Sequence, residues 1–178
     1  MFRVARVQSP QICCKYIRDN YPDLLWAIGG RNKEKLQQIK SDFNLNCDVI
    51  EADGADMEAL KLMSSQTKVV LSTAGPFARY GSLLVQACVE EGSHYTDITG
   101  ENHWVKGLID KHHEEAASKG IRIIPSCGYD SIPSDIGAFF TISYSKPPLR
   151  QSLLNLLFWP YKVLKTCFQN RQSKKSTY

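Results

Sequence analysis

Short apolar runs alternate along most of the chain with stretches whose apolar side chains recur at helical spacing. The apolar runs predict strands over residues 2–7, 24–28, 48–52, 68–73, 94–98 and 121–124. Each intervening stretch opens near a residue that favours a helix N-terminus, and these residues are Ser9, Asn32, Asp56, Ser82 and Asn102. Leu24 to Ile28 is apolar throughout, which is typical of a strand buried on both faces. Gly92 is a favoured helix terminator.

Six strands separated by five helices predict an α/β fold with a doubly wound, mostly parallel sheet of Rossmann type. Ligands of such sheets bind outside the carboxyl ends of the strands. We therefore expect the functional residues in the turns that follow the strands, which are residues 29–32, 52–56, 73–81, 99–102 and 126–135.

The pattern changes near Phe140. Residues 1–135 hold 15 basic and 18 acidic residues, whereas residues 136–178 hold 7 basic residues and no acidic one. We expect a dinucleotide-binding domain over residues 1–140 and an irregular or helical tail, apolar and then basic, over residues 141–178. A basic segment of this kind can indicate a nucleic-acid partner, an anionic membrane surface or a non-native extension. The sequence contains no RNA- or DNA-binding motif, which argues against a nucleic-acid partner.

The composition and the cysteine content indicate the class of protein and its cellular compartment. With 178 residues, 43% of them hydrophobic and 22% charged, the chain falls among globular proteins. Its six cysteines form no CxxC pair and its histidines show no metal-ligand spacing, so we expect buried thiols in a reducing, intracellular compartment and no metal site.

The first 18 residues allow two interpretations. They are basic and lack acidic residues, as in a mitochondrial transit peptide. The alternative is a strand followed by a helix with Pro10 at its first position. The inward face of that helix would comprise Ile12, Cys13, Tyr16 and Ile17. The cap, the proline and the periodicity agree, so we favour the strand and helix.

The first strand-to-helix turn lacks the glycines of a dinucleotide site. It reads Val7-Gln8-Ser9-Pro10-Gln11, and Pro10 has no amide to donate. Glycines normally let backbone amides approach the pyrophosphate. We therefore expect this chain to bind a dinucleotide weakly.

Three later turns are candidates for a cofactor site. Gly30-Arg31 follows the second strand, where an arginine suits the 2′-phosphate of NADP, although a surface arginine fits equally. Asp53 could edge an adenine pocket or cap a turn. Small residues end the fourth strand and would let a ligand ring lie close, or would form a tight turn: Thr73, Ala74, Gly75, Pro76 and Phe77.

Two loops could carry chemistry. Asp97 and Glu101 flank Thr99-Gly100 and could do acid–base work, or could support the strand end and the helix start. The segment 126–135 is interpreted as a binding loop that leads into a helix, because no base accompanies Cys127 or Ser131. Tyr80 and Tyr129 are candidate proton donors by position alone.

Four segments together resemble the saccharopine dehydrogenase-like oxidoreductases, which include trans-acting enoyl reductases. They are residues 27–36, 69–77, 95–101 and 128–135, within a resemblance that covers roughly residues 19–140. It implies NADP or NAD as cofactor and hydride transfer to an unsaturated or imine-type substrate that could be lipid-related, since family members are linked to lipid droplets and membranes. By this resemblance Gly30 and Arg31 meet the adenosine end, Asp53 the adenine, and residues 73–77 the nicotinamide half. The implied substrate-side residues are Tyr80, Asp97, Gly100, Glu101, Gly128, Tyr129, Asp130 and Ser131.

The chain departs from that family at both ends. The family's glycine-rich first turn is absent, and family members continue for a few hundred residues beyond the match. A shortened isoform or an incomplete gene model would explain both departures. The alternative function is a non-catalytic protein at a membrane or lipid-droplet surface, held there by its C-terminal tail.

Overall fold

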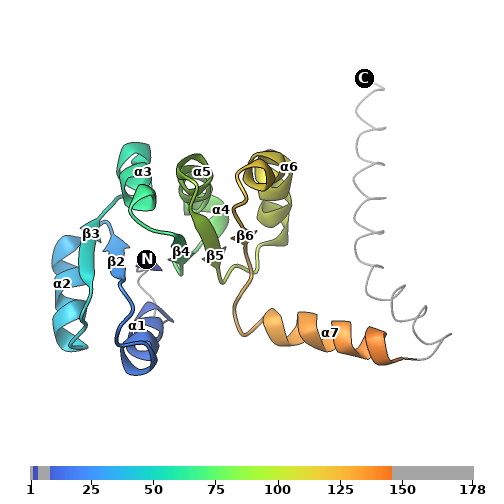
Figure 1. Ribbon diagram of the computed structural model, residues 1–178, viewed down its shortest axis with the longest axis horizontal. Helices are drawn as coiled ribbons and strands as arrows, with labels where there is room; N and C mark the ends of the chain where they lie inside the picture. Colours follow the sequence, from blue (N-terminus) through green and yellow to red (C-terminus); the bar gives the residue numbers. More distant parts are fainter. Residues whose placement is uncertain (1, 4–8, 146–178) are drawn as a thin grey trace, which may run out of the picture. The chain divides into compact units, whose positions relative to one another are not determined.

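The computed structural model describes residues 2–3 and 9–145 (Figure 1). The chain divides into two compact units, residues 1–131 and residues 132–178. The predicted boundary after residue 140 falls within the last described helix and stays a prediction. The predictions for residues 4–8 and for the tail from residue 146 onward lie outside the described residues.

The first unit is built on a parallel sheet with the strand order β3-β2-β1-β4-β5-β6. Its strands are β1 (Phe2–Arg3), β2 (Ala27–Gly30), β3 (Asp48–Glu51), β4 (Val69–Ser72), β5 (His94–Asp97) and β6 (Ile123–Ile124). The chain builds outward from β1 to β3 and then returns to β4 on the other side of β1. This reversal makes the sheet doubly wound, so the predicted fold class is confirmed and the ligand crevice of such folds lies outside the ends of β1 and β4.

Helices cover both faces of this sheet. They are α1 (Ser9–Asn20), α2 (Lys33–Asp42), α3 (Met57–Ser65), α4 (Phe77–Tyr80), α5 (Ser82–Glu91) and α6 (Asn102–Ser118). Figure 1 shows α3, α5 and α6 along one side of the sheet and α1 on the other. Each side has its own apolar core: Leu60, Val85 and Leu108 belong to the first, and Cys14 and Leu36 to the second.

Local chemistry sets several helix ends as predicted. The Asn32 side chain accepts a hydrogen bond from the Lys35 amide at 2.7 Å, and that of Asp56 accepts from the amides of Glu58 and Ala59. Such caps satisfy amides that have no partner inside the helix. Gly92 ends α5 with a φ of 77°, a left-handed conformation that favours glycine.

Two local predictions are wrong, and a third holds only in part. β2 begins only at Ala27, and Leu25 is 98% exposed, because the pairing of β2 with β3 starts at Ala27 and Asp48. Ser82 does not cap α5, since α4 intervenes and Gly81 takes the cap position. The inward face of α1 is predicted only in part: Ile17 is buried as expected, but Cys14 is buried beside it, while Ile12 and Tyr16 are exposed.

The thiols are mostly buried, as expected. Burial raises the pKa of Cys14 to about 12 and that of Cys88 to about 11, so both stay protonated and unreactive. Among the thiols of the described residues, Cys13 is half-buried and Cys127 is exposed on a loop. Within the described ranges, no group of three acidic, histidine or cysteine side chains is placed to hold a metal ion.

The second unit begins with α7 (Ile132–Tyr144), the helix predicted to follow the loop at residues 126–135. None of its residues is buried, although its sequence is strongly apolar. Phe139 and Tyr144 are 66% and 82% exposed. In the part of the chain that the structure describes, no helix combines the length and the hydropathy that a membrane crossing requires.

Candidate functional site

The candidate site lies where β4, β5 and β6 end. These strands are neighbours in the sheet and run parallel, so the loops that follow them meet at one edge. The three loops comprise residues 73–76, 98–101 and 125–131. They contain most of the residues predicted from the sequence to contact the nicotinamide half of the cofactor or the substrate.

Asp97 joins two of these loops. Its side chain is fully buried at the end of β5. Its Oδ1 accepts hydrogen bonds from the amides of Thr99 at 3.0 Å and Ser126 at 2.9 Å, and its backbone carbonyl accepts from the Cys127 amide at 2.7 Å. The carboxylate therefore holds the loop after β6 against the end of β5, and its buried charge is compensated by amide donors.

Tyr95 supplies the third partner of Asp97 and was not nominated from the sequence. Its hydroxyl donates to Asp97 Oδ2 at 2.9 Å, and it also shares a side-chain hydrogen bond with Ser72 at the end of β4. Burial, followed by the negative charge of Asp97, raises the pKa of Tyr95 far above its ordinary value. The signal available in the sequence was the spacing, because residues two apart on a strand share a face.

Glu101 joins the loop after β5 to the turn after β4. Its Oε1 accepts a hydrogen bond from the Phe77 amide at 2.6 Å, and its Oε2 accepts from the Ala78 amide at 3.0 Å. Its own amide donates to Thr99 Oγ1 at 3.1 Å. Glu101 and Asp97 therefore both bind backbone amides, and these contacts agree with the supporting role that the sequence left open beside acid–base work.

The turn after β4 is close-packed on its inner side and open on its outer side. Thr73, Ala74 and Phe77 are buried, whereas Gly75 and Pro76 are exposed and joined by a cis peptide bond. The Phe77 ring packs against Trp104 with 5.9 Å between ring centroids. The exposed part of the turn therefore offers small residues on a rigid base, to which a flat ring could lie close.

The other candidate residues follow β2 and β3. Gly30 is buried, and its carbonyl accepts from the Ala52 amide at 2.9 Å, which aligns the ends of the two strands. Arg31 is exposed and has no hydrogen bond or ion pair to the described residues. Asp53 accepts from the Ala55 amide at 3.0 Å and so caps the turn, one of the two roles considered for it.

The remaining nominated residues form the outer rim of the loops. Tyr80 is 42% exposed beneath the Arg79 guanidinium, which lies 5.1 Å from the ring centroid. Gly128 packs so close to Ile98 that an added Cβ would lie 3.2 Å from the Ile98 Cβ. Exposed positions complete the rim: Gly100, Tyr129 (89% exposed) and Asp130, with Ser131 half-buried.

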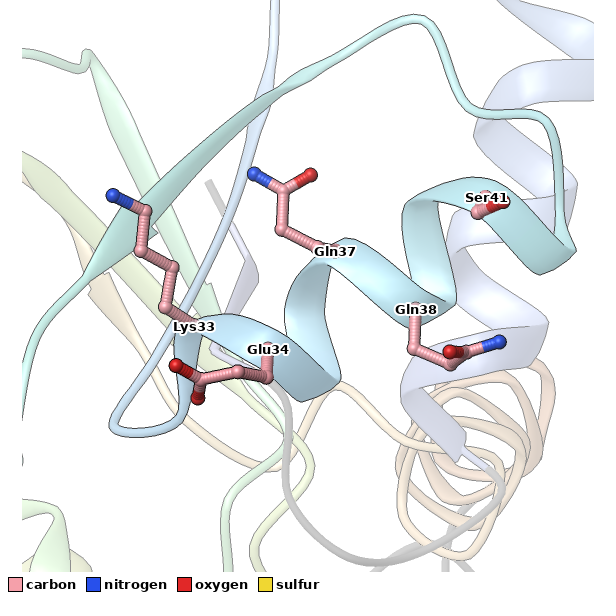
Figure 2. A pocket seen from close by; sticks show the side chains of 5 residues that line it. All are labelled: Lys33, Glu34, Gln37, Gln38 and Ser41. Carbon is pink, nitrogen blue, oxygen red and sulfur yellow. The ribbon is translucent and has the colours of Figure 1, made fainter.

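Two surface hollows are present among the described residues, the first away from these loops and the second bordered by Pro125 at the start of the loop after β6. All five side chains that line the first rise from α2 (Figure 2), so it is the solvated face of a single helix: Lys33, Glu34, Gln37, Gln38 and Ser41. The second, of about 240 Å³, is apolar and lies between α6 and β6. His112 is buried in its wall while His113 is exposed, as expected for neighbours on a helix.

The residues present fit a nicotinamide dinucleotide. A cationic side chain without a partner among the described residues stands at the end of β2, and small exposed residues end β4 on the other side of the switch point. These are the chemical types that meet a 2′-phosphate and a flat ring.

Comparison with known proteins identifies the family. The family model "Saccharopine dehydrogenase NADP binding domain" matches residues 16–124, more than half of the chain. The chain is 40% identical over 127 residues to a saccharopine dehydrogenase-like oxidoreductase of Mus musculus, covering 66% of this chain and 30% of that protein. It is 40% identical over 116 residues to a trans-acting enoyl reductase of Mycobacterium leprae, covering 64% and 28%.

Two further similarities extend this result. A lipid droplet localized protein of Caenorhabditis elegans is 34% identical over 129 residues, with 68% of this chain and 30% of that protein covered. The fold matches apo saccharopine dehydrogenase (L-Glu forming) from Saccharomyces cerevisiae with a TM-score of 0.67 at 16% identity, covering 80% of this chain and 30% of that one.

The chain spans less than a third of the length of the curated relatives it matches. The family match begins at residue 16 and so leaves out the glycine-free first turn. The resemblance read from the four sequence segments is confirmed. The chain belongs to the saccharopine dehydrogenase NADP-binding domain family, whose cofactor is NADP or NAD.

Proposed function

We propose that this chain is the cofactor-binding part of an oxidoreductase that acts on an unsaturated or imine-type carbon, including such carbons in lipid-related substrates. The proposal rests on the positions of Arg31 and of the turn at residues 73–77. They follow β2 and β4, which lie on the two sides of the sheet's switch point. Reduced nicotinamide supplies a hydride when bound. Two of the relatives are an enoyl reductase and an oxidoreductase, which supports the reaction class.

Arg31 would distinguish NADP from NAD. Its guanidinium is exposed at the end of β2, where the adenosine ribose of a dinucleotide lies in this fold. A planar cation suits a 2′-phosphate, and a carboxylate in its place would suit a 2′-hydroxyl. Gly30 would allow the close approach of the adenosine, and Asp53 would border it while capping its own turn.

The turn at residues 73–77 would carry the nicotinamide half, and the rim would face the substrate. Tyr80 and Tyr129 are the exposed phenols of this rim and are the candidates for giving a proton to the substrate. Gly100, Gly128, Asp130 and Ser131 would shape the substrate side, while Asp97 and Glu101 hold the loops in place.

The affinity of this chain for its cofactor is proposed to be low. The first strand-to-helix turn has no glycine, and Pro10 has no backbone N–H to donate to a phosphate. Each charge-assisted hydrogen bond to phosphate contributes about 1.5–3 kcal/mol, so two missing contacts weaken binding by about a hundredfold or more.

Titration calorimetry with NADPH tests the proposal. We expect saturable binding with a dissociation constant well above the micromolar range, and weaker binding of NADH. Micromolar affinity would overturn the low-affinity part, and equal or stronger binding of NADH would overturn the proposed role of Arg31.

A second candidate function is association with a lipid surface. It is favoured by α7, a strongly apolar helix without a buried residue, and by the composition of the sequence after position 135, which holds 7 basic residues and no acidic one. Exposed apolar side chains beside basic ones suit an anionic lipid surface. One relative is named for lipid droplets, which supports a lipid-droplet or membrane-associated location.

Vesicle flotation distinguishes this candidate. The full chain should float with anionic vesicles, and the double variant Phe139→Glu with Phe140→Glu should float less, because both rings are exposed on α7. A matched double variant on the first unit, Lys33→Glu with Lys35→Glu, carries a larger change of charge away from α7. Equal recovery of wild type and α7 variant would remove the candidate.

A further inference from the structure

We infer that Glu101 is a positioning residue, whose carboxylate fixes the turn at residues 73–77 by binding the first amides of α4. The inference rests on the proposed function in one respect, which is that this turn borders the nicotinamide half of the cofactor. It differs from the acid–base role suggested by the sequence, because it assigns Glu101 to the protein backbone and leaves proton transfer to other groups.

The geometry is that of a helix cap supplied from a distant part of the chain. The amides at the start of a helix have no partner inside it. Pro76 occupies the cap position of α4 and provides no side-chain acceptor. Glu101 lies 24 residues from Phe77 and fills this role, with one carboxylate oxygen 2.6 Å from the Phe77 nitrogen and the other 3.0 Å from the Ala78 nitrogen.

The residue type matches the task. A carboxylate accepts at both oxygens, and hydrogen bonds from amides to an ionised acceptor are about twice as strong as neutral ones. Glutamine has one accepting oxygen, so its amide group would face a backbone N–H that also donates. Alanine would leave both amides of Phe77 and Ala78 without this acceptor.

The other end of Glu101 is held firmly. The backbone amide of Glu101 donates to Thr99 Oγ1. The backbone amide of the buried Thr99 donates in turn to Asp97 Oδ1. Phe77 packs against Trp104 on α6, the helix that Glu101 begins. The turn is therefore fastened to the loop after β5 both by the carboxylate and by the ring.

This arrangement fixes the exposed part of the turn. Gly75 and Pro76 immediately precede the clamped amides and lie in the turn that follows β4. Hydride transfer requires a closely defined ring position, so a shift of the turn would displace the nicotinamide half without affecting contacts at Arg31. Glu101 should therefore affect the nicotinamide half of the dinucleotide and leave the adenosine half unchanged.

Backbone-resolved amide exchange of the full chain tests the clamp. In Glu101→Ala, the amides of Phe77 and Ala78 should both lose protection, and in Glu101→Gln one of the two should lose it. The amides of Cys88 and Val89, which lie in the buried second half of α5, should stay protected in every variant, which reports an intact fold. Glu114→Gln, an exposed glutamate on α6, is the matched control and should change neither amide.

Two ligands then test the positioning. NADPH should bind Glu101→Ala about tenfold more weakly than wild type, because the turn is no longer held. Adenosine 2′,5′-bisphosphate lacks the nicotinamide and should bind both proteins equally. General destabilisation would weaken both ligands, so this split separates positioning from a merely structural role.

Each outcome is decisive. Retained protection of Phe77 and Ala78 in Glu101→Ala would overturn the clamp. Lost protection with unchanged NADPH affinity, or equal weakening of both ligands, would overturn the positioning role while the proposed function stands. If wild type binds neither ligand, the proposed function fails, and the exchange rates alone then decide whether the clamp exists.

Discussion

The Tyr95 hydroxyl donates to Asp97 Oδ2 at 2.9 Å, and both side chains are buried on the same face of β5. The two amides that donate to Oδ1 complete the coordination of the carboxylate. This pair therefore links β5 to the loop after β6, and through Ser72 it reaches the end of β4. Buried polar contacts within the protein therefore hold the loops of the candidate site in place without any contact from the cofactor.

Removing the Asp97 carboxylate should strongly destabilise the fold. Asp97→Ala would remove the acceptor of the amides of Thr99 and Ser126 and leave the buried Tyr95 hydroxyl with Ser72 alone, which predicts a loss of about 3 kcal/mol or more in the free energy of unfolding. Asp97→Asn should cost less, about 1–2 kcal/mol, because the phenol can accept a hydrogen bond from the new amide group. Urea unfolding measures both, and equal losses would contradict this account of the network.

The raised pKa of Tyr95 predicts a loss of stability at alkaline pH. The contribution of this group is fully present below its ordinary pKa of 10.0 and is lost as the pH rises toward the higher folded-state value, because only the unfolded state then releases the proton. Unfolding measured between pH 9 and pH 11 should therefore show a steeper decline in wild type than in Tyr95→Phe. Parallel curves for the two proteins would be evidence against a buried phenol.

Gly81 has no room for a side chain. An added Cβ would lie 2.7 Å from Trp104 Cζ2 and 2.8 Å from the Phe77 carbonyl oxygen. Gly81→Ala should therefore lower the free energy of unfolding by about 1–3 kcal/mol. Gly107→Ala is the control, because its Cβ would meet nothing within 4 Å inside α6 and should stabilise the helix by up to about 1 kcal/mol. Thermal unfolding should show shifts of opposite sign.

Arg31 should determine the choice between the two cofactors. Arg31→Ala removes the proposed partner of the 2′-phosphate and should weaken NADPH binding by about tenfold or more, while NADH binding stays unchanged. Arg122→Ala, an exposed arginine beside β6, should bind both cofactors as wild type does. Calorimetry on the three proteins measures this, and an equal decline for NADPH and NADH would argue against a 2′-phosphate contact.

Local chemistry made part of the fold predictable. Asn32, Asp56 and Gly92 act within their own helix ends, so residue type and position sufficed. The start of β2 at Ala27 depends on pairing with β3, and a run of apolar residues alone does not indicate where that pairing begins. The inward face of α1 was predicted only in part for the same reason, since packing against the sheet buries Cys14 and leaves Ile12 exposed.

The candidate site was predictable in location but less so in its contacts. The alternation of strands and helices placed the loops at one edge, and the four segments indicated the family. The role of Glu101 could not be read from the sequence, because the amides it binds lie 24 and 23 residues away. Tyr95 was overlooked because its partner Asp97 was considered only with Glu101, although the spacing of two residues on a strand favours contact.

The central claim is that Arg31 and the turn at residues 73–77 contact the same dinucleotide. Backbone amide resonances recorded while NADPH is added to the full chain test it most directly. We predict that the amides of Arg31, Ala74 and Gly75 shift together with a single dissociation constant, while those of Ile109 and His113 beside the α6 hollow do not move. Shifts confined to that hollow, or to only one of the two turns, would contradict the claim.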